Sequence, residues 1–315
     1  MKKRLHFWLM TLVLFLAAQT GHVAYAQNPQ TIEVGPHFGA TSYIGELNAW
    51  RNLDQWEWKK FNQFDYELGG VVRYNYDSRW AFRMDYTYGR LRACDTAAAW
   101  RPEAMLNFRS TLHDLSLMVE FNFLKYYTGR PETAISPYIF AGVSGFMFSS
   151  RPYTTDTLLA PIFDTLRFGD LRTENLSYSK YSLSIPFGVG CKFSLSKHLS
   201  ATVEWRMHYT FTDYLDDVSG VYPADGKHVL LVPKKDGDGN IPYSQGYPKG
   251  YEVIVANPSE NNRTVIYDFS DPSGNFSEGQ QRGNATTNDW FGMINLSLTW
   301  KFVIPGNSAC KMNFE

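Results

Sequence analysis

Two segments contain the side chains that nucleophilic catalysis requires. His113 lies between Ser110 and Ser116. His208 lies in the same segment as Ser200. A serine activated by a neighbouring histidine is the chemistry of a lipid-modifying hydrolase. The spacing matches no nucleophile motif, and the chain has no G-x-S-x-G elbow. We therefore expect a protein that is not an enzyme, and we expect His113 at a membrane interface.

A third segment, Asp236-Gly237-Asp238-Gly239-Asn240, spaces side-chain oxygens as a calcium-binding loop does. Ile241 stands where an EF-hand requires glycine, and no glutamate follows at the twelfth position of the loop. Asp236, Asp238 and Asn240 are therefore weak calcium candidates beside the plainer interpretation of a turn-rich loop. We expect no cofactor and no dedicated metal site.

The composition excludes several classes of protein. The chain has 315 residues, of which 44% are hydrophobic and 16% aromatic, so it is not a disordered chain. Its 30 basic residues nearly balance its 31 acidic residues, and no nucleic-acid partner is expected from such a charge balance. The three cysteines show no C-x-x-C spacing, which predicts neither a disulfide framework nor a structural zinc site.

The first 26 residues have the features of a secretory signal peptide. Lys2, Lys3 and Arg4 precede an apolar run over residues 5–18, and the small-residue pattern Ala24-Tyr25-Ala26 predicts cleavage after residue 26. The first residue after this cleavage site is Gln27 and not the cysteine that carries the lipid of a lipoprotein, so a lipid-anchored lipoprotein is disfavoured. The alternative is an uncleaved anchor, but the run is shorter than the roughly 20 residues of a spanning helix. The sequence thus divides into a signal peptide (1–26), a main domain (27–302) and a short tail (303–315).

The main domain alternates between apolar and polar residues, with the period of two that β-strands show. The clearest runs cover residues 65–76, 80–89, 114–123, 182–193, 199–211 and 292–302, and two weaker runs cover 32–48 and 136–148. All of these runs exceed the about 5 or 6 residues typical of strands in a soluble sandwich, which is the alternative fold. An apolar face ending in aromatic residues, opposite a charged face, is typical of a transmembrane β-barrel. We predict an all-β fold, an eight-stranded antiparallel transmembrane β-barrel.

The lengths of the connections support the same fold. Asp77-Ser78 and the residues around Ser196-Lys197 form short turns, and the connection at 125–135 is of middling length. The others are longer, at 49–63, 92–107, 149–180 and 212–287. Outer-membrane barrels have short periplasmic turns and longer extracellular loops. We therefore expect the 76-residue segment 212–287 to be the last external loop.

One face of the predicted strands carries charged residues of both signs. We expect them inside the barrel, as a salt-bridged polar core that satisfies buried charges. An eight-stranded lumen is narrow enough for side chains to fill, so we expect no open pore. The alternative to a salt-bridged core is that these charges form a path for protons or ions. The inward set is Glu67, Arg73, Arg83, Asp85, Glu120, Lys192, Glu204, Arg206 and Lys301.

Several short strings, taken in their order along residues 32–302, resemble the PorG-like family of outer-membrane β-barrels associated with the type IX secretion system. The strings are Gly39-Ala40-Thr41-Ser42-Tyr43-Ile44-Gly45-Glu46-Leu47-Asn48, Arg73-Tyr74-Asn75, Arg79-Trp80, Tyr88-Gly89-Arg90, Asn107-Phe108-Arg109-Ser110, Glu120-Phe121-Asn122-Phe123, Pro137-Tyr138-Ile139-Phe140-Ala141-Gly142 and Asp213-Tyr214-Leu215-Asp216-Asp217-Val218-Ser219. No single string is diagnostic, and the resemblance rests on their number and order.

This resemblance implies an integral protein of the cell outer membrane, in contact with its lipid, that anchors a periplasmic ring lipoprotein and its partner subunit. The outer-membrane translocon of the same system is a further candidate partner. On such a barrel the ring would contact the periplasmic side, so the expected contact residues are Asp77, Ser78, Ser196 and Lys197, with the 125–135 turn and the 303–315 tail. The alternative is a surface-binding or adhesion barrel similar to OmpA or OmpX, acting through its external loops.

Overall fold

The computed structural model describes residues 30–45, 47, 64–94, 106–152, 173–174, 176–226, 228–256 and 264–304. The predicted signal peptide, most of the first long connection and the tail beyond residue 304 lie outside the described residues.

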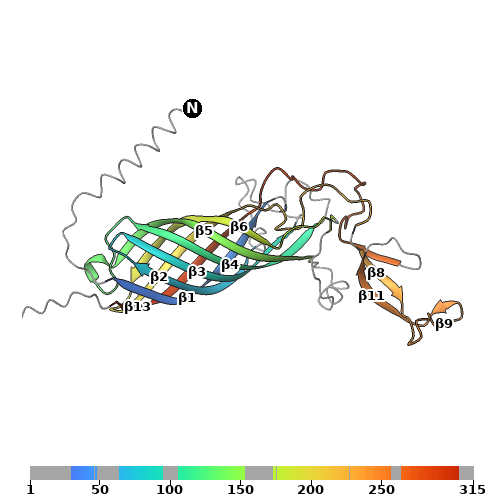
Figure 1. Cartoon of the computed structure of the whole chain (residues 1–315), viewed down its shortest axis with the longest axis horizontal. Coiled ribbons are helices and arrows are strands. Elements are labelled where there is room, and N and C mark those ends of the chain that lie inside the picture. Colours follow the sequence, from blue (N-terminus) through green and yellow to red (C-terminus); the bar gives the residue numbers. More distant parts are fainter. Residues whose placement is uncertain are drawn as a thin grey trace, which may run out of the picture.

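Eight long strands form a closed antiparallel barrel (Figure 1). The sheet closes between the first and last of them, in a register that runs from Thr31 opposite Val303 to Ile44 opposite Trp290. All eight predicted segments are strands, and the predicted fold class is confirmed. The barrel strands are β1(Thr31–Ile44), β2(Asp65–Asn75), β3(Trp80–Cys94), β4(Asn107–Asn122), β5(Ile135–Pro152), β6(Tyr181–Ser194), β7(Leu199–Thr210) and β13(Trp290–Val303).

The barrel has an apolar outside and a polar inside. On β4, for example, Leu115, Leu117 and Val119 are exposed, while the residues between them are buried. Exposed apolar side chains also cover the outer faces of the other strands, among them Phe82, Met84, Tyr86, Leu183, Val203, Trp205, Ile294 and Leu298. A soluble sandwich would turn this apolar face inward, so the observed arrangement is that of a membrane-spanning barrel. Among the described residues, no helix has the length and apolar character needed to cross a bilayer.

Aromatic pairs mark the two ends of the apolar belt on β3 and β4. Trp80 packs against Phe121 with ring centroids 4.9 Å apart, near the short turns. Tyr88 packs against His113 with centroids 5.1 Å apart, nearer the long connections. The strand from Trp80 to Tyr88 has nine residues, which meets the lower limit of the about 9–11 residues with which a tilted strand crosses a membrane. His113 lies on the outer face beside this pair, a position that suits the predicted interfacial side chain.

The connections alternate as the sequence predicts. The β2–β3 and β6–β7 turns are short, and the β4–β5 connection contains the 3-10 turn η4(Pro131–Thr133). The last long connection has secondary structure of its own, which the sequence analysis did not predict. It forms a sheet in the order β11(Tyr251–Ala256), β8(His228–Pro233), β12(Thr264–Asp268), and a hairpin of β9(Tyr243–Ser244) and β10(Tyr247–Pro248). These strands extend beyond one end of the barrel (Figure 1).

A buried carboxylate joins two of the long connections where they leave the barrel. Asp217 has a positive φ of 64° and is buried. Its Oδ2 accepts a hydrogen bond from the Thr173 backbone N–H at 2.8 Å, and its Oδ1 accepts one from the Tyr178 hydroxyl at 2.6 Å. The Arg282 guanidinium donates to the Asp217 carbonyl at 2.9 Å and pairs with Glu174 at 3.2 Å. The β5–β6 and β7–β13 connections are therefore held together through this cluster.

This cluster predicts that the local stability of the two connections depends on pH. Burial raises the pKa of Asp217 above its usual value, although hydrogen bonds and Arg282 act in the opposite direction. A carboxyl group whose pKa is higher in the folded protein favours the fold in its protonated form. Its contribution to stability is fully present below the unfolded pKa of about 4 and is lost as the pH rises through the folded pKa. We expect amide protection of residues 213–220, corrected for intrinsic exchange, to fall as the pH rises through that range. Asn tolerates positive φ, so Asp217→Asn is the matched variant, and its protection should depend less on pH. Equal pH dependence in both proteins would contradict this account.

Candidate functional site at the short-turn end

The β4–β5 connection, residues 123–134, closes the short-turn end of the barrel, and we call it the cap turn. The Tyr126 backbone N–H donates to the Ser78 carbonyl in the β2–β3 turn at 3.0 Å. The Gly129 N–H donates to the Ser194 hydroxyl oxygen at the end of β6 at 2.7 Å. The side chains of Tyr126 and Thr128 are buried. The cap turn is thus fastened to both neighbouring turns.

Thr128 connects the cap turn to the barrel interior. Its hydroxyl donates to Glu33 Oε1 at 2.5 Å, and its carbonyl accepts a hydrogen bond from the Lys301 ammonium. Glu33 lies on β1 and Lys301 on β13, the two strands that close the sheet. The position of the cap turn is therefore coupled to barrel closure.

Gly129 allows the cap turn to approach the β6–β7 turn closely. Its φ of +91° lies in the region that glycine adopts most readily. A Cβ at this position would lie 2.6 Å from the Lys197 carbonyl oxygen. Both conditions require a residue without a side chain.

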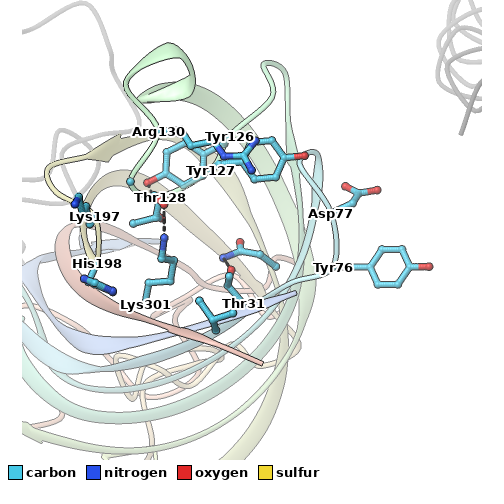
Figure 2. A pocket seen from close by; sticks show the side chains of 13 residues that line it. Thr31, Tyr76, Asp77, Tyr126, Tyr127, Thr128, Arg130, Lys197, His198 and Lys301 are labelled. Carbon is cyan, nitrogen blue, oxygen red and sulfur yellow. Dashed lines mark hydrogen bonds between the residues drawn. The ribbon is translucent and has the colours of Figure 1, made fainter. Parts of the chain in front are cut away.

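A pocket of about 350 Å³ lies between the cap turn and the barrel rim (Figure 2). It is built from residues at the beginning of β1, the β2–β3 turn, the cap turn, the β6–β7 turn and the end of β13. The lining residues are Thr31, Asn75, Tyr76, Asp77, Tyr126, Tyr127, Thr128, Gly129, Arg130, Lys197, His198, Lys301 and Val303.

Basic and aromatic side chains dominate the pocket. Arg130, Lys197 and Lys301 contribute positive charge, and Asp77 is the acidic residue of the lining. The Asp77 carboxylate accepts hydrogen bonds from the backbone N–H groups of Arg79 at 2.6 Å and Trp80 at 2.7 Å, so it stabilises the β2–β3 turn. These features suit an acidic group carried by a partner.

Tyrosines give the pocket a second kind of contact. The Arg130 guanidinium lies 4.7 Å from the centroid of the Tyr127 ring, within range of a cation–π interaction. Burial, with the Glu33 charge as a further cause, raises the pKa of Tyr126 to about 12. Tyrosine is neutral at pH 7 even at its ordinary pKa of about 10, and this shift keeps Tyr126 neutral to a still higher pH.

The structure brings part of the sequence-predicted contact set together. Asp77 and Lys197 both line the pocket. Ser78 supplies the carbonyl that holds the cap turn, and the Ser196 hydroxyl oxygen accepts the Leu199 N–H at 3.2 Å, so both serines build the turns. The 125–135 turn contributes Tyr126 to Arg130, and the described part of the 303–315 tail contributes Val303. Thr31, Asn75, Tyr76 and His198 also line the pocket and were not predicted, although Tyr76 and His198 immediately flank predicted turn residues.

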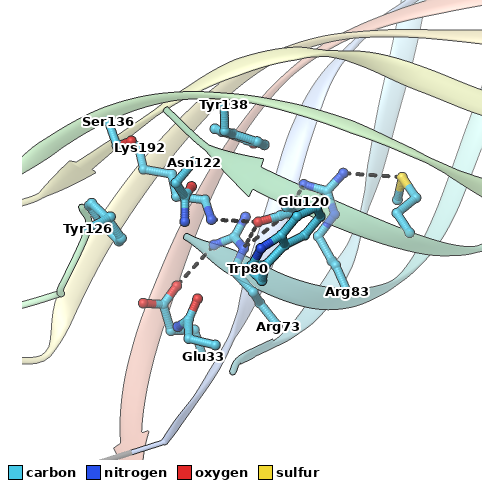
Figure 3. Close-up of polar contacts among 12 residues, drawn as sticks. Glu33, Arg73, Trp80, Arg83, Glu120, Asn122, Tyr126, Ser136, Tyr138 and Lys192 are labelled. Carbon is cyan, nitrogen blue, oxygen red and sulfur yellow. Dashed lines mark hydrogen bonds and ion pairs between the residues drawn. The ribbon is translucent and has the colours of Figure 1, made fainter. Parts of the chain in front are cut away.

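Below the pocket, a network of ion pairs crosses the lumen (Figure 3). Arg73 pairs with Glu33 and with Glu120, at 3.0 Å in each case. Glu120 also pairs with Arg83 at 2.8 Å and with Lys192 at 2.5 Å. One carboxylate on β4 therefore contacts cations from β2, β3 and β6.

The network continues toward β7. Arg206 pairs with Asp85 at 2.5 Å and with Glu204 at 3.1 Å, and Glu204 also pairs with Arg83. The Tyr138 hydroxyl on β5 donates to Glu204. Four cations thus balance four carboxylates, all of them buried. The predicted inward set lies inside the barrel, with Lys301 at its rim. Glu33 is a further member of the network that was not predicted.

The structure separates the residues considered as candidates for a hydrolase. His113 lies on the outer face, where its Nδ1 is 2.9 Å from the Tyr86 hydroxyl, while Ser110 and Ser116 are buried inside. His208 is buried inside, and its Nδ1 faces Ser184 at 3.0 Å, whereas Ser200 contacts Thr299 at 2.7 Å. Neither histidine is placed to activate the serine that lies near it in the sequence.

The calcium candidates form a turn. Asp236 Oδ1 accepts backbone N–H groups from Asp238 at 3.1 Å and Asn240 at 2.8 Å, and Gly239 has a φ of +82°. Over the part of the chain that the structure describes, no group of three or more His, Cys, Asp or Glu residues could hold a metal ion. The turn accounts for this spacing of polar residues.

Replacing Gly129 with alanine should destabilise the barrel. The positive φ and the contact with the Lys197 carbonyl together should cost about 2 kcal/mol or more. Thermal unfolding in detergent micelles measures this cost. Gly239→Ala is the matched control, since its φ is also positive but no atom lies within 4 Å of the Cβ that alanine would add there. Equal unfolding temperatures for Gly129→Ala and wild type would refute the role given to Gly129.

Replacing Glu120 with glutamine should also destabilise the barrel. Removing the shared carboxylate leaves three cations incompletely paired in the lumen, and breaking such a buried network costs about 3–5 kcal/mol. Urea unfolding in lipid vesicles measures the change. Glu132→Gln, at an exposed position of the cap turn, should unfold like wild type. A Glu120→Gln variant as stable as that control would mean that the network contributes little.

One comparison with known proteins shows the family, and the others are weak or find no match. The sequence profile of DUF6089, described as a domain of unknown function, matches residues 7–232. No curated protein matches the chain. The solved structures with some similarity include Neisserial surface protein A, with 11% identity, coverage of 87% of this chain and 97% of that chain, and a TM-score of 0.38. Pseudomonas aeruginosa OprG has 9% identity, coverage of 88% and 97%, and a TM-score of 0.38.

The N-terminal barrel domain of Pseudomonas aeruginosa OprF has 10% identity, coverage of 86% and 97%, and a TM-score of 0.32. At these scores the structural similarities add nothing to the strand topology described above. The profile match covers more than half of the chain, from before the first barrel strand into β8. By this match, the chain belongs to the DUF6089 family.

Proposed function

We propose that this protein is an integral outer-membrane barrel that anchors a periplasmic complex of the type IX protein secretion system. The partners would be the ring lipoprotein and its partner subunit, with the translocon as a further neighbour. The observation that carries the proposal is the pocket at the short-turn end, which combines basic and tyrosine side chains on a rigid frame.

The location in the outer membrane is supported by the two faces of the barrel. An apolar outer belt bounded by aromatic pairs requires a hydrocarbon surrounding, and closed barrels of this kind occur in outer membranes. Such barrels have their short turns in the periplasm. The pocket would then face the periplasm, where a ring lipoprotein can reach it.

An anchoring role is supported by the interior of the barrel. The ion pairs from Glu33 to Glu204 occupy the lumen below the pocket, and the cap turn lies over them. Such a barrel is poorly suited to conduct solutes, but it holds the pocket in one geometry. Preformed sites lose less conformational entropy on binding. The resemblance to the PorG-like family supplies the identity of the partner.

A photo-crosslinking amino acid at position 127 tests the proposal in intact cells. Tyr127 lies in the pocket lining, so the crosslinked product should contain the ring lipoprotein or its partner subunit. The control position is 243, whose side chain is exposed in the β9–β10 hairpin. Crosslinks to these proteins from position 243 but not from position 127 would refute the proposed contact.

Charge reversal in the pocket provides a second test. We expect Lys197→Glu combined with Arg130→Glu to lower recovery of the ring lipoprotein about tenfold or more. The two substitutions replace cations that attract an acidic partner by carboxylates that repel it. Lys125→Glu, on the same cap turn but outside the pocket lining, is the control. Unchanged recovery with the double variant would contradict an electrostatic contact.

The alternative function, surface binding through the external loops, is favoured by one observation. The last connection carries a three-stranded sheet with exposed Tyr251 and Val265, which an ordinary flexible loop lacks. Deleting residues 228–268 removes this sheet and keeps Asp217 and Arg282. Secretion should survive this deletion if the barrel is an anchor, whereas binding to surface ligands should be lost if the loops are the functional part.

A further inference from the structure

Arginines lie in one row across three neighbouring barrel strands at the end with the long connections. Arg92 on β3 is opposite Arg109 on β4, and Arg109 is opposite Arg151 on β5. Arg90 lies one outward position before Arg92 on the same strand. We call Arg90, Arg92 and Arg109 the arginine strip. The salt-bridged lumen and the short-turn pocket do not include any of them.

The strip lies on the outer face of the barrel. On β3, Arg90 and Arg92 alternate with Leu91 and Ala93, which are fully buried. On β4, Arg109 lies between the buried residues Phe108 and Ser110. Alternate residues of a strand point to opposite faces. The strip is therefore directed toward the surroundings of the barrel.

The strip begins just beyond the apolar belt. Tyr88 and His113 form the aromatic pair at this end of the belt, and Arg90 follows Tyr88 by two residues, about 7 Å along the strand. Tyrosines at the edge of a membrane-spanning region lie at the level of lipid headgroups. Arg90 and Arg92 thus lie where the headgroups of the adjoining leaflet would be.

Local contacts orient Arg90 and Arg92 but neutralise these two side chains incompletely. Arg90 and Arg92 share one carboxylate, Asp65, at 3.5 Å and 4.0 Å, which is long for an ion pair. The Arg90 guanidinium lies 4.3 Å from the centroid of the Tyr66 ring, and Arg92 donates to the Phe64 carbonyl at 2.8 Å. The guanidinium groups of Arg90 and Arg92 are thus positioned in advance, and their two positive charges exceed the single negative charge of Asp65.

We propose that the arginine strip binds the phosphate group of an anionic glycolipid in the outer leaflet of the membrane. A planar guanidinium matches phosphate oxygens in a two-pronged geometry, and arginine is favoured at such sites for this reason. Below the strip, the exposed side chains of Tyr86 and Leu115 offer a surface for acyl chains. A lipid therefore satisfies both parts of this surface, whereas a free phosphate ion satisfies one. The inference does not depend on the role in secretion.

The test titrates the folded full-length protein in a nonionic detergent with lipid A that carries its phosphates, and counts bound lipid by native mass spectrometry. The other arms use dephosphorylated lipid A and inorganic phosphate as a competitor. We expect phosphorylated lipid A to bind at least about tenfold more tightly than the dephosphorylated form, and inorganic phosphate at the same concentration to leave it bound. Equal binding of the two lipids, or displacement by inorganic phosphate, would overturn the proposal.

Variants locate the binding on the protein. We expect the double variant Arg90→Gln with Arg92→Gln to lose about tenfold or more in affinity for phosphorylated lipid A. Arg79→Gln, an arginine beside the short turns at the opposite end, should bind like wild type. Asp65→Asn removes the competing carboxylate and should tighten binding several-fold, which keeps the test decisive if the double variant fails to fold. An equal loss with Arg79→Gln, or an unchanged affinity with Asp65→Asn, would rule out the strip as the binding site.

Discussion

The closure of the sheet between β1 and β13 is the constraint on which the other features of this structure depend. A strand inside a hydrocarbon layer must satisfy every backbone hydrogen bond within the protein, and closure removes the two open edges. Closure also separates the side chains into an outer apolar set and an inner set cut off from water. The inner set then needs its own balance of charge, and both ends of the barrel need side chains suited to an interface.

The ion pairs inside the barrel connect this constraint to the candidate site. Glu33, on the closing strand β1, contacts Arg73 in the network and Thr128 in the cap turn. Lys301, on the other closing strand, holds the carbonyl of the same threonine. The pocket therefore lies on a frame that forms when the barrel closes. We infer that a partner bound at this pocket would be held rigidly relative to the membrane.

The sequence predicts the barrel well because its signal is simple. Strict alternation over long segments determines strand, face and the inward position of residues such as Arg83 and Glu204, and these predictions are confirmed. Individual ion pairs cannot be predicted in this way. Glu120 contacts cations from three other strands, and such contacts depend on strand order, stagger and side-chain rotamers. The hydrolase candidates show the same limit, because His113 and Ser116 are close in the sequence but lie on opposite faces.

The site at the short turns could be predicted in part for a related reason. Asp77 and Lys197 are recognisable as turn residues, and both line the pocket. The pocket itself arises because the cap turn bends over the barrel mouth, and this bend depends on Gly129 and on contacts with Ser78 and Ser194 from distant parts of the sequence. Likewise, the sheet formed by β8, β11 and β12 pairs short strands within a long connection, where alternation is too brief to be distinctive.

Affinity purification from gently solubilised outer membranes tests the central claim most directly. The tag belongs in the exposed β9–β10 hairpin, so that the short-turn end stays accessible to its partner. If the barrel is a periplasmic anchor, the ring lipoprotein and its partner subunit should be recovered with it in stoichiometric amounts. Recovery of the folded barrel without either protein, under conditions where the ring itself remains assembled, would contradict the anchoring function.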